Sequence, residues 1–126
     1  MRRLIAAGII ALLLVGICIT HHLTIKNSIE VLQSHTEAYA NALEKKDTTS
    51  LQNTSARLTE DWKRHRQFLS LFVNHTMLEE LDVSVENLYS YTKIENFELA
   101  FVELAALRKR IKKMETDASI HLESVF

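Results

Sequence analysis

Proline is absent from this chain of 126 residues, and glycine occurs only twice. Average usage would give about six prolines and nine glycines in a chain of this length. Both glycines, Gly8 and Gly16, lie in an N-terminal apolar run, so the rest of the sequence has neither residue. Phosphate-binding glycine-rich loops, dinucleotide-binding fingerprints and tight primed hairpin turns are therefore excluded.

The chain also has only one cysteine and almost no net charge. Cys18 is the only cysteine, so no disulfide can form within the chain, and a reduced, buried thiol is the favoured interpretation. Lys and Arg total 15 and Asp and Glu total 16, which gives a formal net charge of -1. A nearly neutral chain has no strong field to attract nucleic acid, so we expect no nucleic-acid partner.

The most distinctive feature present is an unbroken apolar run from Leu4 to Ile19, which follows Arg2 and Arg3. A membrane-spanning helix needs about 20 apolar residues, with a lower limit near 17. No face of the run is polar, whereas a small soluble helix would be amphipathic. The sequence therefore predicts a helix that contacts membrane lipid through Leu4 to Ile19.

A retained anchor is favoured over a cleaved signal peptide, which stays an alternative. The only candidate cleavage site, Gly16-Ile17-Cys18, lies inside the apolar run, and Ile17 does not suit a lipoprotein site. Arg2 and Arg3 outweigh Lys26 beyond the run, which places the N-terminus in the cytoplasm. We expect residues 1–24 to form a single-pass anchor in the cell membrane and residues 25–126 to lie outside the cytoplasm.

Beyond the anchor, apolar positions follow heptad spacing of alternating four and three residues, which is typical of helices. The first helix is expected to continue directly from the anchor and to end near Lys45-Lys46, before candidate N-caps from Asp47 to Ser50. Either Asn74 or Thr76 caps a new helix, or the second helix runs on with a bend, and residues 92–96 are the expected break before the last helix. The predicted core positions are Ile25, Ile29, Leu32, Thr36, Tyr39 and Leu43, then Leu51, Ser55, Leu58, Trp62, His65, Leu69 and Phe72, then Leu71, His75, Leu78, Leu81, Val85 and Leu88, and finally Phe97, Phe101, Leu104, Leu107, Ile111, Met114, Ala118, His121 and Val125.

No segment alternates with the period of two that is typical of a strand. The predicted fold class is therefore all-α: an N-terminal transmembrane helix followed by a small antiparallel bundle of three to four helices.

The six histidines give the strongest candidate site, although the predicted metal content is none. His75, Glu79 and Asp82 have i, i+4, i+7 spacing, which places an imidazole and two carboxylates on one helix face. An ordinary His–Glu surface pair has the same spacing and is favoured. The Glu-x-x-His motif of di-iron bundles is absent. His21-His22 is expected at the membrane surface, and His65 as a packed side chain with one hydrogen bond.

Other chemistry finds little support in the sequence. A nucleophile elbow would need glycines, so we expect no enzyme and no cofactor. The basic run from Arg108 to Lys113 is interpreted as a solvated helix face. The aromatic residues are interpreted as core rather than as a ligand pocket; they are Trp62, Tyr89, Tyr91, Phe97 and Phe101.

Several short motifs stand out together: Trp62, His75, Leu81-Asp82, the run from Phe97 to Leu107, and the ending Leu122-Glu123-Ser124-Val125-Phe126. With these motifs the chain resembles an uncharacterised bacterial family common in Firmicutes, called domain of unknown function 4363. Ser124 stands where the family usually has Asn, and Glu79 follows His75 later than is usual, which weakens any role for that corner. The resemblance implies a bacterial envelope protein with an N-terminal membrane segment and no assigned activity.

Three functions remain open from the sequence. The first is a membrane-anchored, extracytoplasmic structural or protein-interaction module that binds a partner or itself. The second is a bundle that senses a small molecule and works through a partner, since only residues 1–3 precede the anchor. The third is a metal-dependent protein that uses His75.

Overall fold

The computed structural model describes residues 1–71 and 73–125, without the side chains of residues 21, 22, 24 and 118–125. Four helices account for nearly all of these residues: α1 (Arg2–Lys45), α2 (Thr48–Leu69), α3 (His75–Lys93) and α4 (Phe97–Val125). The all-α prediction is confirmed for this part of the chain. The predictions for the His21-His22 pair, Phe72, Ala118, His121, Val125 and the ending at Phe126 lie outside it.

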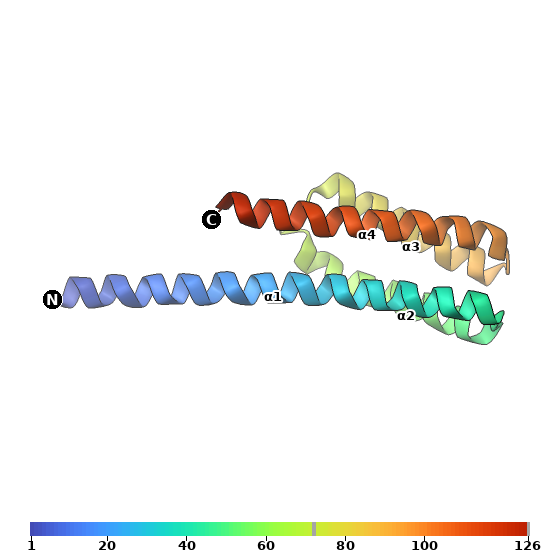
Figure 1. Cartoon of the computed structure of the whole chain (residues 1–126), viewed down its shortest axis with the longest axis horizontal. Coiled ribbons are helices and arrows are strands. Elements are labelled where there is room, and N and C mark those ends of the chain that lie inside the picture. The colour runs from blue at the N-terminus through green and yellow to red at the C-terminus, as the bar shows by residue number, and fades with distance from the viewer. Residues whose placement is uncertain (72, 126) are drawn as a thin grey trace.

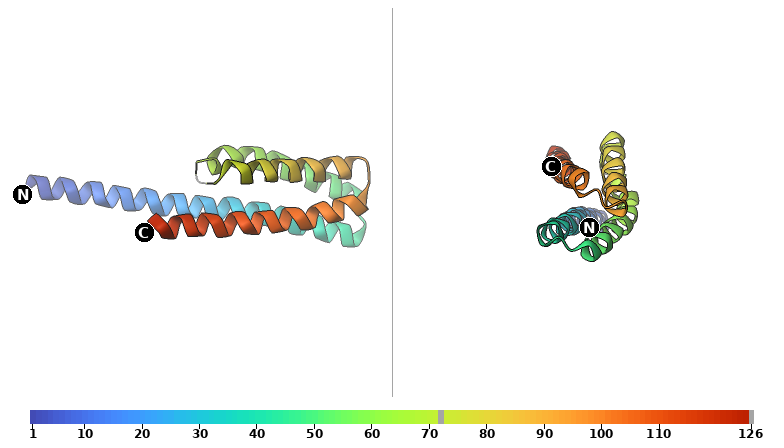
Figure 2. Two further views of the ribbon diagram at one scale, coloured as in Figure 1. Left: turned by 90° about the horizontal axis from the view of Figure 1, so that it is seen from above. Right: turned by 90° about the vertical axis from the view of Figure 1, so that its right-hand side faces the viewer.

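The helices form an antiparallel bundle in which successive helices run in opposite directions (Figure 1). Helix α1 packs against α2 and α4, and α3 packs against the same two helices on the other side (Figure 2). The N-terminal part of α1 extends alone beyond the bundle (Figures 1 and 2). As predicted, the apolar run and the first bundle helix are one unbroken helix.

Polar side chains cap the starts of α2 and α3 near the predicted positions. Asp47 precedes α2, and its carboxylate accepts hydrogen bonds from the Ser50 amide at 3.3 Å and the Ser50 hydroxyl at 2.7 Å. Asn74 caps α3 by accepting from the Thr76 amide at 2.9 Å. Lys46 and Glu95 follow α1 and α3 with left-handed φ angles of 55° and 59°. This conformation is usual where a helix ends, but glycine normally provides it, and the chain has no glycine there.

The core is one continuous apolar cluster from all four helices. Most predicted positions are buried, and Tyr39, Leu78, Leu81, Leu88, Leu107 and Met114 have no exposed surface. Three predictions are wrong: Leu71, His75 and Phe101 are exposed. A turn separates α2 from α3, so Leu71 and His75 do not continue the seam of α3. In α4 the seam passes through Ala100, and Phe101 lies about 100° away around the helix.

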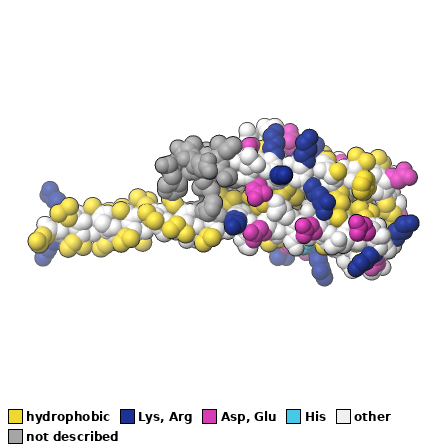
Figure 3. Space-filling view, viewed as in Figure 1, with side chains coloured by type: hydrophobic (Ala, Val, Ile, Leu, Met, Phe, Trp, Pro, Cys, Tyr) yellow, Lys and Arg dark blue, Asp and Glu magenta, His cyan; other side chains and the backbone are white. Residues whose placement is uncertain are grey.

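Among the residues whose side chains are described, the bundle does not bury the apolar run. Leu4 is 79% exposed, and the large apolar side chains from Ile5 to Ile19 are at least half exposed. Among the side chains of α1 that the structure describes, the first buried one is Ile25. Figure 3 shows this part of α1 as a rod of hydrophobic side chains with Lys and Arg side chains at its far end.

Candidate functional site

The structure separates the three candidate metal-binding residues. His75 Nε2 lies 3.1 Å from Glu79 Oε1, and these two side chains are 75% and 62% exposed. Asp82 instead points to α2, where its carboxylate accepts hydrogen bonds from Trp62 Nε1 at 2.6 Å and Arg66 Nε at 2.8 Å. Within the described residues, no three His, Cys, Asp or Glu side chains gather as a metal site would require. Asp82 thus joins two helices, and His75 lies in an exposed side-chain pair with Glu79.

Polar contacts of the same kind link α1 to α2. Ser28 Oγ and His65 Nδ1 lie 2.9 Å apart, so His65 is a packed histidine with one hydrogen bond, as predicted. His35 Nε2 lies 2.5 Å from Asp61 Oδ2. These partly buried pairs fix which face of α1 meets α2.

A further hydrogen bond crosses the bundle from α1 to α3. The Thr92 hydroxyl donates to the Leu88 carbonyl at 2.7 Å, so the Tyr39 hydroxyl, 2.6 Å from Thr92 Oγ1, is the donor to Thr92. Burial raises the pKa of Tyr39 above its usual value, and the hydrogen bond with Thr92 offsets part of the rise. The buried hydroxyl is therefore neutral over the ordinary pH range.

The basic run of α4 is exposed at Arg108, Lys109, Lys112 and Lys113, as predicted for a solvated helix face, and only Arg110 departs from that prediction. Arg110 is half buried; it donates to Ser84 on α3 and lies 3.5 Å from Glu103. Arg108 and Lys112 line a groove between α1 and α4. The aromatic prediction also needs correction: Trp62 is core, but Tyr89 is 38% and Phe101 65% exposed.

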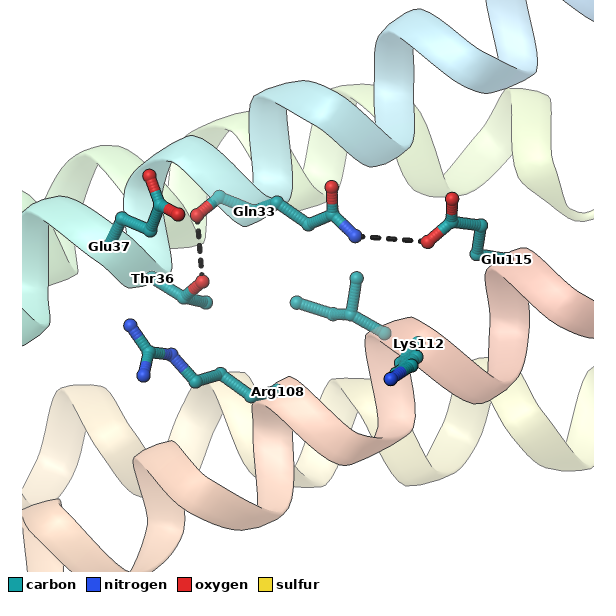
Figure 4. A pocket seen from close by; sticks show the side chains of 7 residues that line it. Gln33, Thr36, Glu37, Arg108, Lys112 and Glu115 are labelled. Atoms are coloured by element: carbon teal, nitrogen blue, oxygen red, sulfur yellow. Dashed lines mark hydrogen bonds between the residues drawn. The ribbon is translucent and has the colours of Figure 1, made fainter.

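A groove runs between α1 and α4, with a polar part nearer the anchor. The volume of this polar part is about 400 Å³, and the Gln33 side chain crosses it to donate a hydrogen bond to Glu115 at 3.1 Å (Figure 4). Arg108 points across the groove toward the side of α1 that carries Glu37 (Figure 4). Among the described residues, neither Glu37 nor Arg108 has an ion-pair partner within 4.0 Å. The lining residues are Gln33, Thr36, Glu37, Arg108, Ile111, Lys112 and Glu115.

The far part of the groove, at the end of the bundle away from the anchor, is more apolar. The volume of this apolar part is about 580 Å³, and Arg108 lines both parts, so the two spaces are neighbours along the face between α1 and α4. Figure 3 shows hydrophobic side chains gathered on this face at that end of the bundle. The lining residues are Ala40, Leu43, Glu44, Phe97, Glu98, Phe101, Leu104 and Arg108.

The sequence reasoning did not find this groove, although one signal was available. Glu30, Glu37 and Glu44 recur every seven residues and are all exposed, so they form an acidic stripe on one side of α1. Arg108 and Lys112 form the basic counterpart on α4. What the sequence could not show is that these two stripes flank one groove.

Comparison with known proteins gives a family and no activity. The family model described as "Domain of unknown function (DUF4363)" matches residues 19–125 of the chain. No curated protein and no solved structure matches the chain.

Proposed function

The chain belongs to the DUF4363 family, and we propose that it is a single-pass, membrane-anchored protein-interaction module whose helical bundle faces outward from the cytoplasm. One observation carries the proposal: the apolar, exposed N-terminal part of α1 is a single helix with the first helix of the bundle. The groove between α1 and α4 is the surface proposed to receive the partner.

The exposure of the apolar run supports a membrane location. Helix α1 is long and apolar enough to cross a membrane, and none of its most apolar stretch is buried. A core helix of a soluble protein would bury one face of such a run, because each large apolar side chain gains about 1.5–3 kcal/mol on burial. Lipid provides that burial here, and the helix satisfies its own backbone hydrogen bonds within the bilayer.

Charges beside the run support an outward-facing bundle. Arg2 and Arg3 lie on one side of it and Lys26 on the other. Positive residues close to a membrane-spanning helix favour the cytoplasmic side. The proposed orientation therefore has the N-terminus inside and the groove outside.

The unbroken helix has a mechanical consequence for this function. No turn separates the apolar run from Ile25, where burial in the bundle begins. A rigid connection holds the bundle at a fixed height above the membrane with its helices close to the membrane normal. A bundle held in this way presents a lateral face, such as the groove, to other proteins in the same membrane.

Membrane retention and protease accessibility of the full chain test the proposal. A C-terminally tagged chain is expected to keep its full mass, to resist alkaline extraction, and to lose the tag when protease is added outside the cytoplasmic membrane. The matched variant Leu13→Arg puts a charge at the centre of the run, which costs about 2.5–3.5 kcal/mol of insertion, and it should be retained less. A shortened, released chain, or a protected tag, would refute the anchor or its orientation.

The polar part of the groove favours a second candidate function, a bundle that binds a small charged molecule. Arg108, Lys112 and Glu115 place both charge signs around a space of about 400 Å³. A ligand that binds only the folded state would raise the free energy of unfolding by about 2.7 kcal/mol when its concentration is a hundred times Kd. The melting temperature would rise with it. A screen of charged metabolites that moves the melting temperature of the intact chain but not of Arg108→Ala would favour this function.

A further inference from the structure

We propose that the partner received by the α1–α4 groove is a second copy of this chain, related to the first by a twofold axis parallel to the helices. The inference rests on the proposed membrane anchor and outward orientation. It names the partner that the proposed function leaves open.

The anchor limits how two copies can meet. A symmetric pair of chains inserted in one membrane with the same orientation is related by a twofold axis along the membrane normal. Because α1 continues from the apolar run into the bundle, the bundle helices lie close to that axis direction. Each residue of one copy then meets residues at the same height in the other, so the shared face must be complementary to itself.

The charges of the groove satisfy this condition. Glu37 on α1 and Arg108 on α4 line the same part of the groove, so they lie at about the same height (Figure 4). A twofold axis through the groove places α1 of one copy against α4 of the other. Glu37 then meets Arg108 of the second copy, and the reverse pair forms by symmetry. Neither residue has an ion-pair partner within its own chain, among the residues described.

The apolar part of the groove satisfies the condition as well. Phe101 is 65% exposed and Phe97 is half buried, and both line this part of the groove with Ala40 and Leu43 of α1. The same axis brings Phe101 of each copy to Ala40 and Leu43 of the other, at the end of the bundle far from the membrane. Apolar surface meets apolar surface there, and water is removed from both.

The opposite face of the bundle lacks this combination. Helix α2 carries Arg57 and α3 carries Glu86, so this face also has both charge signs. Its large exposed apolar side chains on the helices are Val83 and Tyr89, both on α3, with none on α2 in the described part. An axis through that face would therefore place them against polar side chains of α2.

A charge-swap experiment tests the pairing. Two full-length chains with different tags, one carrying Glu37→Arg and the other Arg108→Glu, are produced separately and together, and co-purified in mild detergent. Each variant alone places like charges at both symmetric positions, and self-association is expected to weaken about tenfold. Together the variants restore both pairs, so the mixed dimer should form at the level of the unchanged chain. Misfolding of a single variant would not be repaired by mixing.

The matched control repeats the exchange on the opposite face with Glu86→Arg and Arg57→Glu, which should leave self-association unchanged.

A cysteine experiment then locates the contact in membranes, with Cys18→Ala throughout. A chain with Ala40→Cys and a differently tagged chain with Phe101→Cys should give a doubly tagged product with a short bismaleimide. Val83→Cys in place of Phe101→Cys should not.

The outcomes separate this inference from the proposed function. Retained, outward-facing chains that do not self-associate would overturn the inference and leave the proposed anchor and orientation intact. Self-association that survives both single variants, or that fails only in the control pair, would place the contact elsewhere and also overturn it. Chains that are not retained by the membrane would remove the premise of a shared orientation, and the proposed function would fail first.

Discussion

Replacement of Asp82 by Ala is the sharpest single test of how the bundle is held together. Asp82 accepts hydrogen bonds from Trp62 Nε1 at 2.6 Å and from Arg66 Nε at 2.8 Å, and so joins α3 to α2. The sequence placed Asp82 in a candidate metal site with His75 and Glu79. The structure gives it a purely structural task, and the two assignments predict different results.

The expected loss of stability follows from what the variant leaves behind. Trp62 is 3% exposed, so its indole N–H would stay buried without an acceptor, at a cost of about 1–3 kcal/mol. The Arg66–Asp82 ion pair is about one-third exposed and contributes roughly 0.5–1 kcal/mol. We therefore expect Asp82→Ala to lower the free energy of unfolding by about 2–3 kcal/mol. Asp82→Asn keeps an acceptor for Trp62 and should cost about 1 kcal/mol.

The single tryptophan of the chain provides the assay. Trp62 is buried beside Asp82, so its emission reports unfolding of the bundle without a signal from the apolar run. For a domain of this size the melting temperature of Asp82→Ala should fall by about 10 °C or more. The control His75→Ala removes an exposed ion pair and should change stability by less than about 0.5 kcal/mol. Equal losses for Asp82→Ala and His75→Ala, reversed by a divalent metal, would refute this reasoning.

Three further predictions concern the hydrogen bonds and helix ends. Tyr39→Phe removes the hydroxyl that donates to Thr92 and should lower the free energy of unfolding by about 1–2 kcal/mol in a thermal melt. Because the pKa of Tyr39 is raised in the folded state, the stability of the unchanged protein should fall as pH rises above about 10. The variant should show less of this fall. Glu95→Gly relieves a left-handed residue at φ 59° and should raise the free energy of unfolding by about 1 kcal/mol, whereas an unchanged melting temperature would count against strain there. Hydrogen bonds from Ser50 lower the pKa of Asp47, so the contribution of Asp47 to stability is present above the unfolded pKa of 3.8 and is lost as pH falls through the folded pKa. Asp47→Asn should therefore flatten the acid side of a plot of stability against pH. An identical plot for the variant would contradict the capping role of Asp47.

Local features of the structure followed closely from the sequence. Asp47 and Asn74 cap helices because their short side chains accept from backbone amides that a helix start leaves free. The heptad seam of α1 is buried as predicted from Ile25 to Tyr39, since residues three and four apart share one helix face. The single hydrogen bond of His65 was also predicted from its seam position.

The relations between helices were decided only by the tertiary structure. Asp82 turns away from His75 and toward Trp62 because α3 packs on α2, and spacing within one helix carries no information about its neighbour. Phe101 is exposed while Ala100 is buried because the rotation of α4 about its own axis sets which of its faces is turned inward when it packs on its neighbours. The groove depends on the same choice, since Glu37 and Arg108 lie about seventy residues apart in the chain.

The sequence by itself determined that this protein is helical, that α1 ends at Lys45 and that α1 starts as an apolar helix, and it supplied the caps at which α2 and α3 begin. These properties depend on interactions among residues a few positions apart, which the order of amino acids specifies directly. The tertiary structure alone decided which stripes flank the groove and which carboxylate is used to join two helices. Those outcomes depend on how the faces of separate helices pack against one another, because a side chain finds its partner only after the turns have brought distant helices together.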